Sequence, residues 1–177
     1  MNLISHPYLT EKMVAVVEAA IARVDPERML PQLISLDDES IRVNSGEEEL
    51  SFPLTEYERV MVFGVGKASA QMAAVLEGIL GDRIDGGAVV TKYGRGLRLR
   101  RVNLYEAGHP IPDEEGLKAA REIERLAQEA DEKTLCITLI SGGGSALLVN
   151  PFHDEHTEIS LQEIQQTTKD LLACGAL

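Results

Sequence analysis

The fold of this chain is decided by the stretch Val60-Met61-Val62-Phe63-Gly64-Val65-Gly66-Lys67-Ala68-Ser69. An apolar run typical of a buried β-strand leads into a glycine-rich turn, and an alanine-rich helical pattern follows. The same order recurs where the apolar residues 135–140 precede the turn Ser141-Gly142-Gly143-Gly144-Ser145. In an open α/β sheet, such strand–turn–helix units bring backbone N–H groups together at the strand end, where they bind anions. Two of them predict a ligand with several negative charges, such as a nucleotide or a phosphorylated sugar.

The rest of the chain alternates between strand and helix patterns. Helical spacing predicts helices over 8–24 and 27–30, and alternation of apolar residues predicts a hairpin of 40–43 with 49–52. Further on, strands are expected at 59–63, 84–91, 101–105 and 134–140. Helices are expected at 68–80, 113–130 and 161–173. This order predicts an α/β fold with a doubly wound, mostly parallel sheet. We therefore divide the chain into a helical segment (1–35), a hairpin and linker (36–58) and a β/α core (59–177).

Composition excludes several classes of partner. The formal net charge of -12 argues against nucleic acid or an anionic membrane as the main partner. No run approaches the about 18 apolar residues of a membrane span, and the N-terminus lacks the basic start of a signal peptide. Cys136 and Cys174 lack the spacing of metal ligands. They are interpreted as small core residues of a cytoplasmic protein, with Cys136 in a buried strand.

The first glycine turn does not match the two commonest phosphate-binding motifs. In a P-loop, Met61 would have to be glycine and Ala68 a hydroxyl residue that binds Mg²⁺. In the dinucleotide fingerprint, Ser69 would have to be glycine, and the next strand should end near an acidic residue rather than at Lys92. The sequence therefore supports neither a P-loop ATPase nor a nicotinamide dehydrogenase. It leaves a lysine at the mouth of a helix, or, as the alternative, a tight turn with a solvated lysine.

The second turn and a third segment are more specific. Consecutive glycines lose backbone entropy on folding, about 1 kcal/mol each relative to alanine, so three in a row indicate close approach to a ligand; the alternative is a flexible loop. The third segment, Glu106-Ala107-Gly108-His109-Pro110-Ile111-Pro112-Asp113, follows a strand and should lie at the same sheet edge. Proline makes the backbone around His109 stiff, as suits a ligand-binding or proton-handling residue, although a capping role is equally open.

Together, the segments 64–69, 108–113 and 141–147 resemble the glycerate 2-kinase family of the MOFRL type. The resemblance covers nearly all of this chain. It implies a Rossmann-like N-terminal domain, a smaller C-terminal domain, and ATP- and Mg²⁺-dependent phosphorylation of D-glycerate to 2-phosphoglycerate. Some family members carry the label hydroxypyruvate reductase, which the failed dinucleotide fingerprint does not support.

The resemblance also implies roles for individual residues. Lys67 matches the active-site lysine of the family and is expected to be catalytic. ATP is expected at Gly64, at Gly66 and at the 141–145 loop, which matches the glycine-rich phosphate site of the family. D-glycerate is expected to contact Lys67, His109 and Asp113, and no metal ligand is identified.

The resemblance further implies that the chain is incomplete. The arginine-containing region, the K-G-G segment and the second domain of the family do not follow before Leu177. We expect the full-length protein to be the enzyme and this chain alone to be inactive or nearly so. Its last helix should then leave an apolar patch that is exposed or packs against another chain, formed by Leu161, Ile164, Leu171 and Leu172.

The main alternative is a non-catalytic sugar-phosphate-binding module of the sugar isomerase type. Such modules also contain a strand, a glycine–lysine turn and an alanine-rich helix, as in residues 65–74. They do not require the segments around His109 or the three consecutive glycines, which favours the kinase. A second glycine-rich domain encoded downstream would decide for the kinase.

Overall fold

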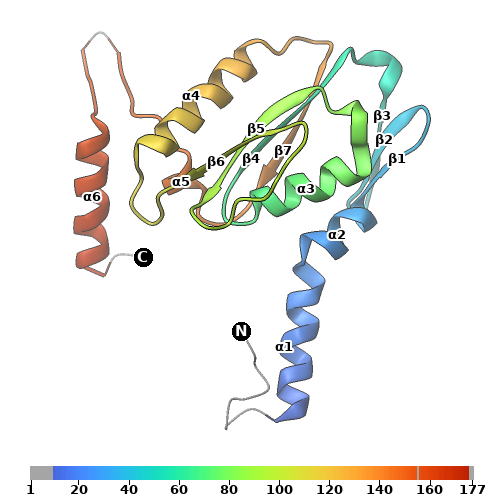
Figure 1. Cartoon of the computed structure of the whole chain (residues 1–177), viewed down its shortest axis with the longest axis horizontal. Helices are drawn as coiled ribbons and strands as arrows, with labels where there is room; N and C mark the ends of the chain where they lie inside the picture. Colours follow the sequence, from blue (N-terminus) through green and yellow to red (C-terminus); the bar gives the residue numbers. More distant parts are fainter. Residues whose placement is uncertain (1–9, 155, 176–177) are drawn as a thin grey trace.

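The computed structural model describes residues 10–154 and 156–175, so the predicted start of the first helix at residue 8 lies outside the described residues. Its centre is a four-stranded parallel sheet in the order β6-β5-β4-β7 (Figure 1). The strands are β4 (Arg59–Val65), β5 (Gly86–Lys92), β6 (Asn103–Ala107) and β7 (Thr134–Ile140). The predicted α/β fold with a mostly parallel sheet is confirmed.

Helices cover both faces of this sheet. Helix α3 (Ser69–Leu80), which connects β4 to β5, packs on one face. Helix α4 (Glu114–Gln128) and the short α5 (Gly144–Leu147) contact β5 from the other face. Neighbouring residues of β5 separate the two layers, because Val89 belongs to the α3 cluster and Val90 to the α4 and α5 cluster. The sheet is therefore doubly wound.

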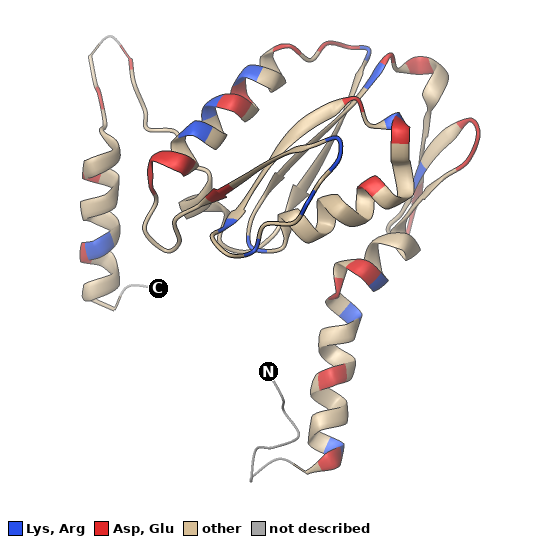
Figure 2. Cartoon of the chain, viewed as in Figure 1, with Lys and Arg blue, Asp and Glu red and all other residues tan. Residues whose placement is uncertain are grey.

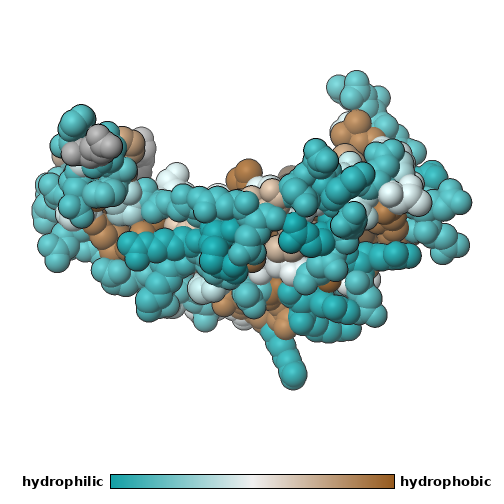
Figure 3. Space-filling view, turned by 90° about the horizontal axis from the view of Figure 1, so that it is seen from above, coloured by the Kyte–Doolittle hydropathy of each residue, from teal (hydrophilic) through white to brown (hydrophobic). Residues whose placement is uncertain are grey.

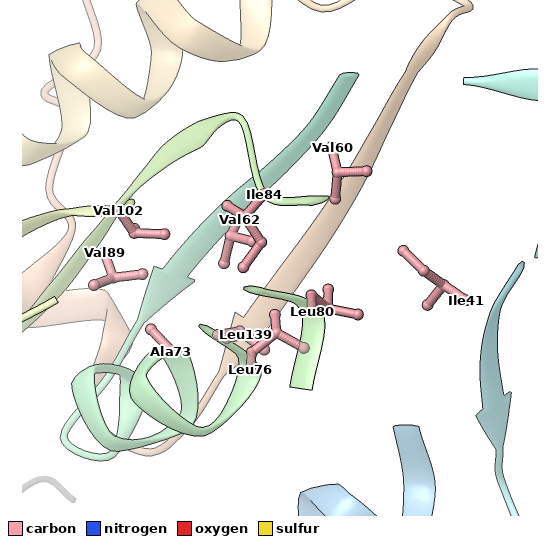
Figure 4. Close-up of a cluster of buried hydrophobic side chains, with 10 residues drawn as sticks. All are labelled: Ile41, Val60, Val62, Ala73, Leu76, Leu80, Ile84, Val89, Val102 and Leu139. Atoms are coloured by element: carbon pink, nitrogen blue, oxygen red, sulfur yellow. The ribbon is translucent and has the colours of Figure 1, made fainter. Parts of the chain in front are cut away.

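The larger core lies between α3 and the sheet. Figure 4 shows Val62 of β4, Val89 of β5 and Leu139 of β7 gathered near Leu76 and Leu80 of α3. These side chains are almost completely removed from water. Their burial holds α3, and with it the turn at its N-terminus, in a defined position against the sheet.

The N-terminal region forms a separate small layer. Helix α1 (Glu11–Val24) and helix α2 (Pro26–Leu33) precede an antiparallel sheet of β1 (Ile34–Leu36), β2 (Ser40–Asn44) and β3 (Glu49–Pro53). The hairpin is confirmed, and Asp25 caps α2 by accepting the N–H of Glu27. Strand β1 was not predicted from sequence, because three residues are too few to show a period of two.

The remaining elements connect or extend the core. Single turns of 3₁₀-helix lie at Leu54–Glu56 and Gly81–Arg83, and helix α6 (Leu161–Ala173) ends the described chain. Ser160 and Glu163 form a capping box at the start of α6. Figure 1 shows α1 and α6 projecting from the body of the molecule. None of the described helices is both long and apolar enough to cross a membrane.

The expectation that both cysteines are core residues is wrong. Cys136 lies on β7, whose outward-facing residues Cys136, Thr138 and Ile140 are exposed. The apolar run was interpreted as a buried strand, but β7 is an edge strand and α4 packs on β5 and β6 instead. Cys174, next to the end of α6, is exposed as well.

Candidate active site

The three motif loops lie at one edge of the sheet. All four strands are parallel, so their last residues Val65, Lys92, Ala107 and Ile140 share the carboxyl edge. The turn after β4 lies between the loops that follow β5 and β7, because β4 is the neighbour of both strands. The predicted shared edge of the two glycine turns and His109 is confirmed.

The first glycine turn is tied to its neighbours by its own backbone. The N–H of Gly66 donates to Val90 O (3.2 Å), the N–H of Lys67 to Gly142 O (3.0 Å), and the N–H of Ala68 to Ser141 Oγ (3.0 Å). These donors are therefore occupied by protein acceptors. At Gly64, a Cβ would lie 2.6 Å from Cγ1 of Val89. Packing thus accounts for Gly64 and Gly66, and their contact with ATP stays a prediction.

The second glycine turn, unlike the first, has backbone N–H groups that are free of protein acceptors in the described part of the chain. Gly143 has a φ of 91°, in the left-handed region, and a Cβ there would lie 2.9 Å from His109 Nε2 and from Lys67 Cε. Within residues 10–154 and 156–175, the N–H groups of Gly142, Gly143 and Gly144 donate to no protein acceptor. Such a row of free N–H groups beside a lysine can hold an anion.

Helix α3 begins at this site without a side-chain cap. Its N-cap residue is Ala68, which has no hydroxyl or carboxylate to accept a first-turn N–H. The hydroxyl of Ser69 is buried and donates to Gly66 O (2.8 Å) or Val90 O (2.7 Å), so it braces the turn. This accounts for serine where the dinucleotide fingerprint has glycine. The positive end of the helix dipole remains directed at the site.

A pocket of about 570 Å³ opens beside Lys67. Its walls carry four basic or imidazole side chains and no carboxylate: it is lined by Lys67, Ala68, Gln71, Lys92, Tyr93, Arg95 and His109. In the part of the chain that the structure describes, Lys67, Lys92 and Arg95 form no ion pair. Figure 2 shows basic residues gathered at the end of β5 and along the segment after it. On a chain of net charge -12, this basic pocket is a local exception.

His109 is half-buried between these cations. Burial, followed by the positive charges of Lys67 and Lys92, holds the pKa of His109 below its usual value of 6.5. The imidazole is therefore neutral at pH 7 and retains one nitrogen that can accept a proton or a hydrogen bond.

Asp113 serves the scaffold at this edge. Its Oδ1 accepts the N–H of Gly116 (3.0 Å) as the N-cap of α4, and its Oδ2 accepts the hydroxyl of Tyr93 (2.8 Å). Burial opposes its ionisation, but hydrogen bonds from Gly116, Gly108 and Tyr93 outweigh burial and lower its pKa. The hydrogen bond between Tyr93 and Asp113 raises the pKa of Tyr93 to about 12. Contact of Asp113 with the substrate stays a prediction.

Sequence reasoning missed part of the pocket. Lys92 was noted only as the end of a strand, and Tyr93 and Arg95 were not among the candidate site residues. The available signal was position, because residues after a parallel strand lie at the carboxyl edge with the other loops. A larger pocket of about 710 Å³ lies between α4 and residues 150–162. None of the motif residues lines it.

The described residues offer no metal cage. Among residues 10–154 and 156–175, no group of three His, Cys, Asp or Glu side chains is arranged to hold a metal ion. His153 and His156 are exposed and lie outside any helix. A cation at this site would need its ligands from a bound molecule or from elsewhere.

Comparison with known proteins identifies one family. Residues 12–177 match the family described as a domain of unknown function, DUF4147. The chain is 39% identical over 160 residues to a glycerate 2-kinase of Pyrococcus horikoshii, covering 90% of this chain and 34% of that protein. It is 36% identical over 155 residues to a D-glycerate 2-kinase of Thermotoga maritima, covering 86% and 36%. A crystal structure of a Pyrococcus horikoshii protein matches with a TM-score of 0.76 at 38% identity, covering 93% of this chain and 35% of that one. The chain thus spans about a third of the length of these relatives.

Proposed function

The chain belongs to the MOFRL-type glycerate 2-kinase family, in which it corresponds to the N-terminal domain, and from this premise we propose that it forms the substrate-binding part of an enzyme that phosphorylates D-glycerate with ATP to 2-phosphoglycerate. The observation that supports this most directly is the meeting of Lys67, His109 and Gly143 at one sheet edge. Family membership favours the kinase over the sugar-phosphate-binding module.

The phosphates of ATP would be held by the second glycine turn. The N–H groups of Gly142, Gly143 and Gly144 have no protein acceptor within the described ranges, and a Cβ at Gly143 would lie 2.9 Å from His109 and Lys67. Phosphate oxygens can take these donors without displacing an existing hydrogen bond. Gly64 and Gly66, also expected at the ATP site, would hold the turn that presents Lys67 to the phosphates.

Lys67 would stand between donor and acceptor. Its side chain passes Gly143 on one side and lines the basic pocket on the other. Phosphoryl transfer needs positioning and compensation of negative charge more than covalent participation by the protein, and a lysine ammonium supplies that charge. The neutral His109 is placed to accept the proton of the acceptor hydroxyl on a ring nitrogen.

Mg²⁺ would enter with the nucleotide. The described residues contain no three-ligand carboxylate or histidine group, and Mg²⁺ in kinases is commonly held in large part by substrate phosphates and water. The ion would compensate phosphate charge, while Lys67 and the free N–H groups orient the phosphates.

The remaining two thirds of the relatives' length would supply the other wall of the site. The basic pocket opens at the surface of this chain, so a second domain is needed to exclude water from two bound substrates. We therefore expect residues 1–177 alone to be inactive or nearly so. We expect the full-length enzyme to act in the cytoplasm, where ATP is available.

The test is a Lys67→Ala variant of the full-length protein. We expect kcat/KM for D-glycerate to fall by at least ~10²-fold, the scale for loss of one preorganised charge. The control is Lys133→Ala, because Lys133 precedes β7 at the opposite edge of the sheet. ³¹P NMR of the product distinguishes 2-phosphoglycerate from 3-phosphoglycerate. Near-normal kinetics of folded Lys67→Ala would remove Lys67 from the reaction, and absence of glycerate phosphorylation by the unmodified enzyme would refute the proposed function.

A further inference from the structure

We propose that Arg95 binds the carboxylate of the phosphoryl acceptor in the basic pocket, and that Glu106 is the positioning residue that holds Arg95 there. This inference rests on the proposed function and names the part of the site that recognises an anionic acceptor. Arg95 belongs to no motif identified from the sequence, and Glu106 was noted only as the first residue of the segment around His109.

The first step is the position of the pocket relative to Lys67. The second glycine turn follows β7, and the segment with Lys92 and Arg95 follows β5. Since β4 lies between β5 and β7, the turn that carries Lys67 has one anion-binding element on each side. A kinase with two anionic substrates needs two such elements, with the transferred group between them.

The second step is the chemistry of the two elements. Backbone N–H groups in a glycine turn suit the several oxygens of a phosphate. The planar guanidinium of an arginine suits a carboxylate, which it can bind through two parallel hydrogen bonds. The glycine turn would therefore take the nucleotide, and Arg95, assisted by Lys92, would take the acceptor.

The third step is how Arg95 is kept in place. Glu106 of β6 accepts the N–H groups of Arg95 (3.1 Å) and Gly96 (3.0 Å) with one carboxylate oxygen. Further along the segment, the buried carboxylate of Glu77 on α3 accepts the N–H groups of three consecutive residues, Arg100, Arg101 and Val102. The exposed segment between β5 and β6 is thus anchored to both the sheet and α3.

The fourth step is the availability of the guanidinium. Arg95 is exposed and, in the described part of the chain, pairs with no carboxylate. Glu106 holds only its backbone. An adjoining pocket of about 310 Å³ brings Glu27 of α2 near Arg95, but the two form no ion pair. The side chain is free to meet a ligand carboxylate in the basic pocket.

The experiment measures KM and kcat of the full-length enzyme for both substrates. Arg95→Gln should raise KM for D-glycerate at least ~10-fold, the effect of losing one charged hydrogen-bonded contact, and leave KM for ATP within about twofold. Arg98→Gln is the matched control, because Arg98 lies on the same segment but does not line the basic pocket. A rise in KM for ATP instead, or no change in either KM, would overturn the proposal.

The positioning role has its own readout. Glu106→Leu should raise KM for D-glycerate with little change in kcat, whereas Glu106→Gln, which keeps an acceptor oxygen, should restore most of the affinity. Combined with Arg95→Gln, Glu106→Leu should add no further rise, because it acts through Arg95. Additive effects, or a loss confined to kcat, would assign Glu106 a general structural role.

Direct binding separates this inference from the proposed function. Calorimetric titration of the full-length protein without nucleotide should detect D-glycerate but not glycerol, which lacks the carboxylate, and Arg95→Gln should abolish the signal. If the protein binds D-glycerate through Arg95 but does not phosphorylate it, the proposed function is wrong and the inference holds. If it phosphorylates D-glycerate and Arg95→Gln leaves binding intact, the inference is wrong and the proposed function holds.

Discussion

At the scale of single residues, the site is defined by how charges are placed around His109. Two cations, Lys67 and Lys92, lower its pKa in addition to the effect of burial. A neutral imidazole among lysines is suited to accept a proton from a hydroxyl, and a protonated one would not be. The unfolded chain protonates histidine near pH 6.5. This residue therefore makes folding less favourable as pH falls through and below that value.

Removing one of these charges should move the titration of His109. We expect Lys67→Met to raise the pKa of His109 toward 6.5, because the protonated ring no longer meets that positive charge. NMR titration of the His109 ring proton measures this directly. Lys133→Met, at the opposite edge of the sheet, should leave the pKa unchanged. An equal or lower pKa in Lys67→Met would show that the charge of Lys67 does not lower the pKa of His109.

At the scale of elements, the two glycine turns have different tasks. The N–H groups of the turn after β4 donate hydrogen bonds to Val90, Gly142 and Ser141, and these bonds hold the strand ends together. The turn after β7 keeps its N–H groups free. The two turns are both rich in glycine but differ in role. The first is a structural turn that presents Lys67, and the second has free N–H groups that can bind an anion.

Alanine substitutions within the second turn should show which of its glycines is required for the conformation of the turn. Gly143→Ala places a Cβ within 2.9 Å of His109 and Lys67 at a φ of 91°. We expect it to cost about 1–2 kcal/mol of stability and to weaken ATP binding. Gly142→Ala is the control, since its φ is not positive and its Cβ would have no neighbour within 4 Å. Thermal unfolding and ATP titration measure the two effects. Equal stability and equal ATP affinity of the two variants would contradict a phosphate site at this turn.

At the scale of the whole molecule, apolar surface remains at the projecting helices. Figure 3 shows brown hydrophobic areas in several places on an otherwise largely hydrophilic face of the molecule. The predicted patch on α6 is right for Leu171 and Leu172, which are 51% and 44% exposed. It is wrong for Leu161 and Ile164, which pack with Leu117 of α4 and Val149. Helix α1 exposes more apolar surface than was foreseen, at Met13, Val16, Val17, Ile21 and Val24.

These faces should make the 177-residue chain self-associate. We expect sedimentation velocity to show species larger than a monomer, because exposed apolar faces gain free energy when they pack together. Leu171→Lys with Leu172→Lys, or Val16→Lys with Ile21→Lys, should each shift the chain toward monomer. The control, Gln128→Lys with Gln162→Lys, changes the net charge equally on polar positions. A monomeric unmodified chain would contradict this expectation.

The sequence by itself determined the elements whose cause is local. β7 and α6 begin and end where predicted, at 134–140 and 161–173, because the apolar periodicity and the flanking turn residues lie within each segment. Parallel strands followed from alternation with helices, and the shared edge of Lys67, His109 and Gly143 followed from parallel strands. Family resemblance then supplied the chemistry.

The tertiary structure alone decided what depends on contacts between distant residues. The exposure of Cys136 follows from which strands α4 covers, and the occupied N–H groups of the first turn follow from Gly142 and Ser141, over 70 positions away. Arg95, which lines the basic pocket, donates its backbone N–H to Glu106 of β6. Such contacts form when the strand ends meet at the sheet edge, and no local pattern of residues encodes that meeting.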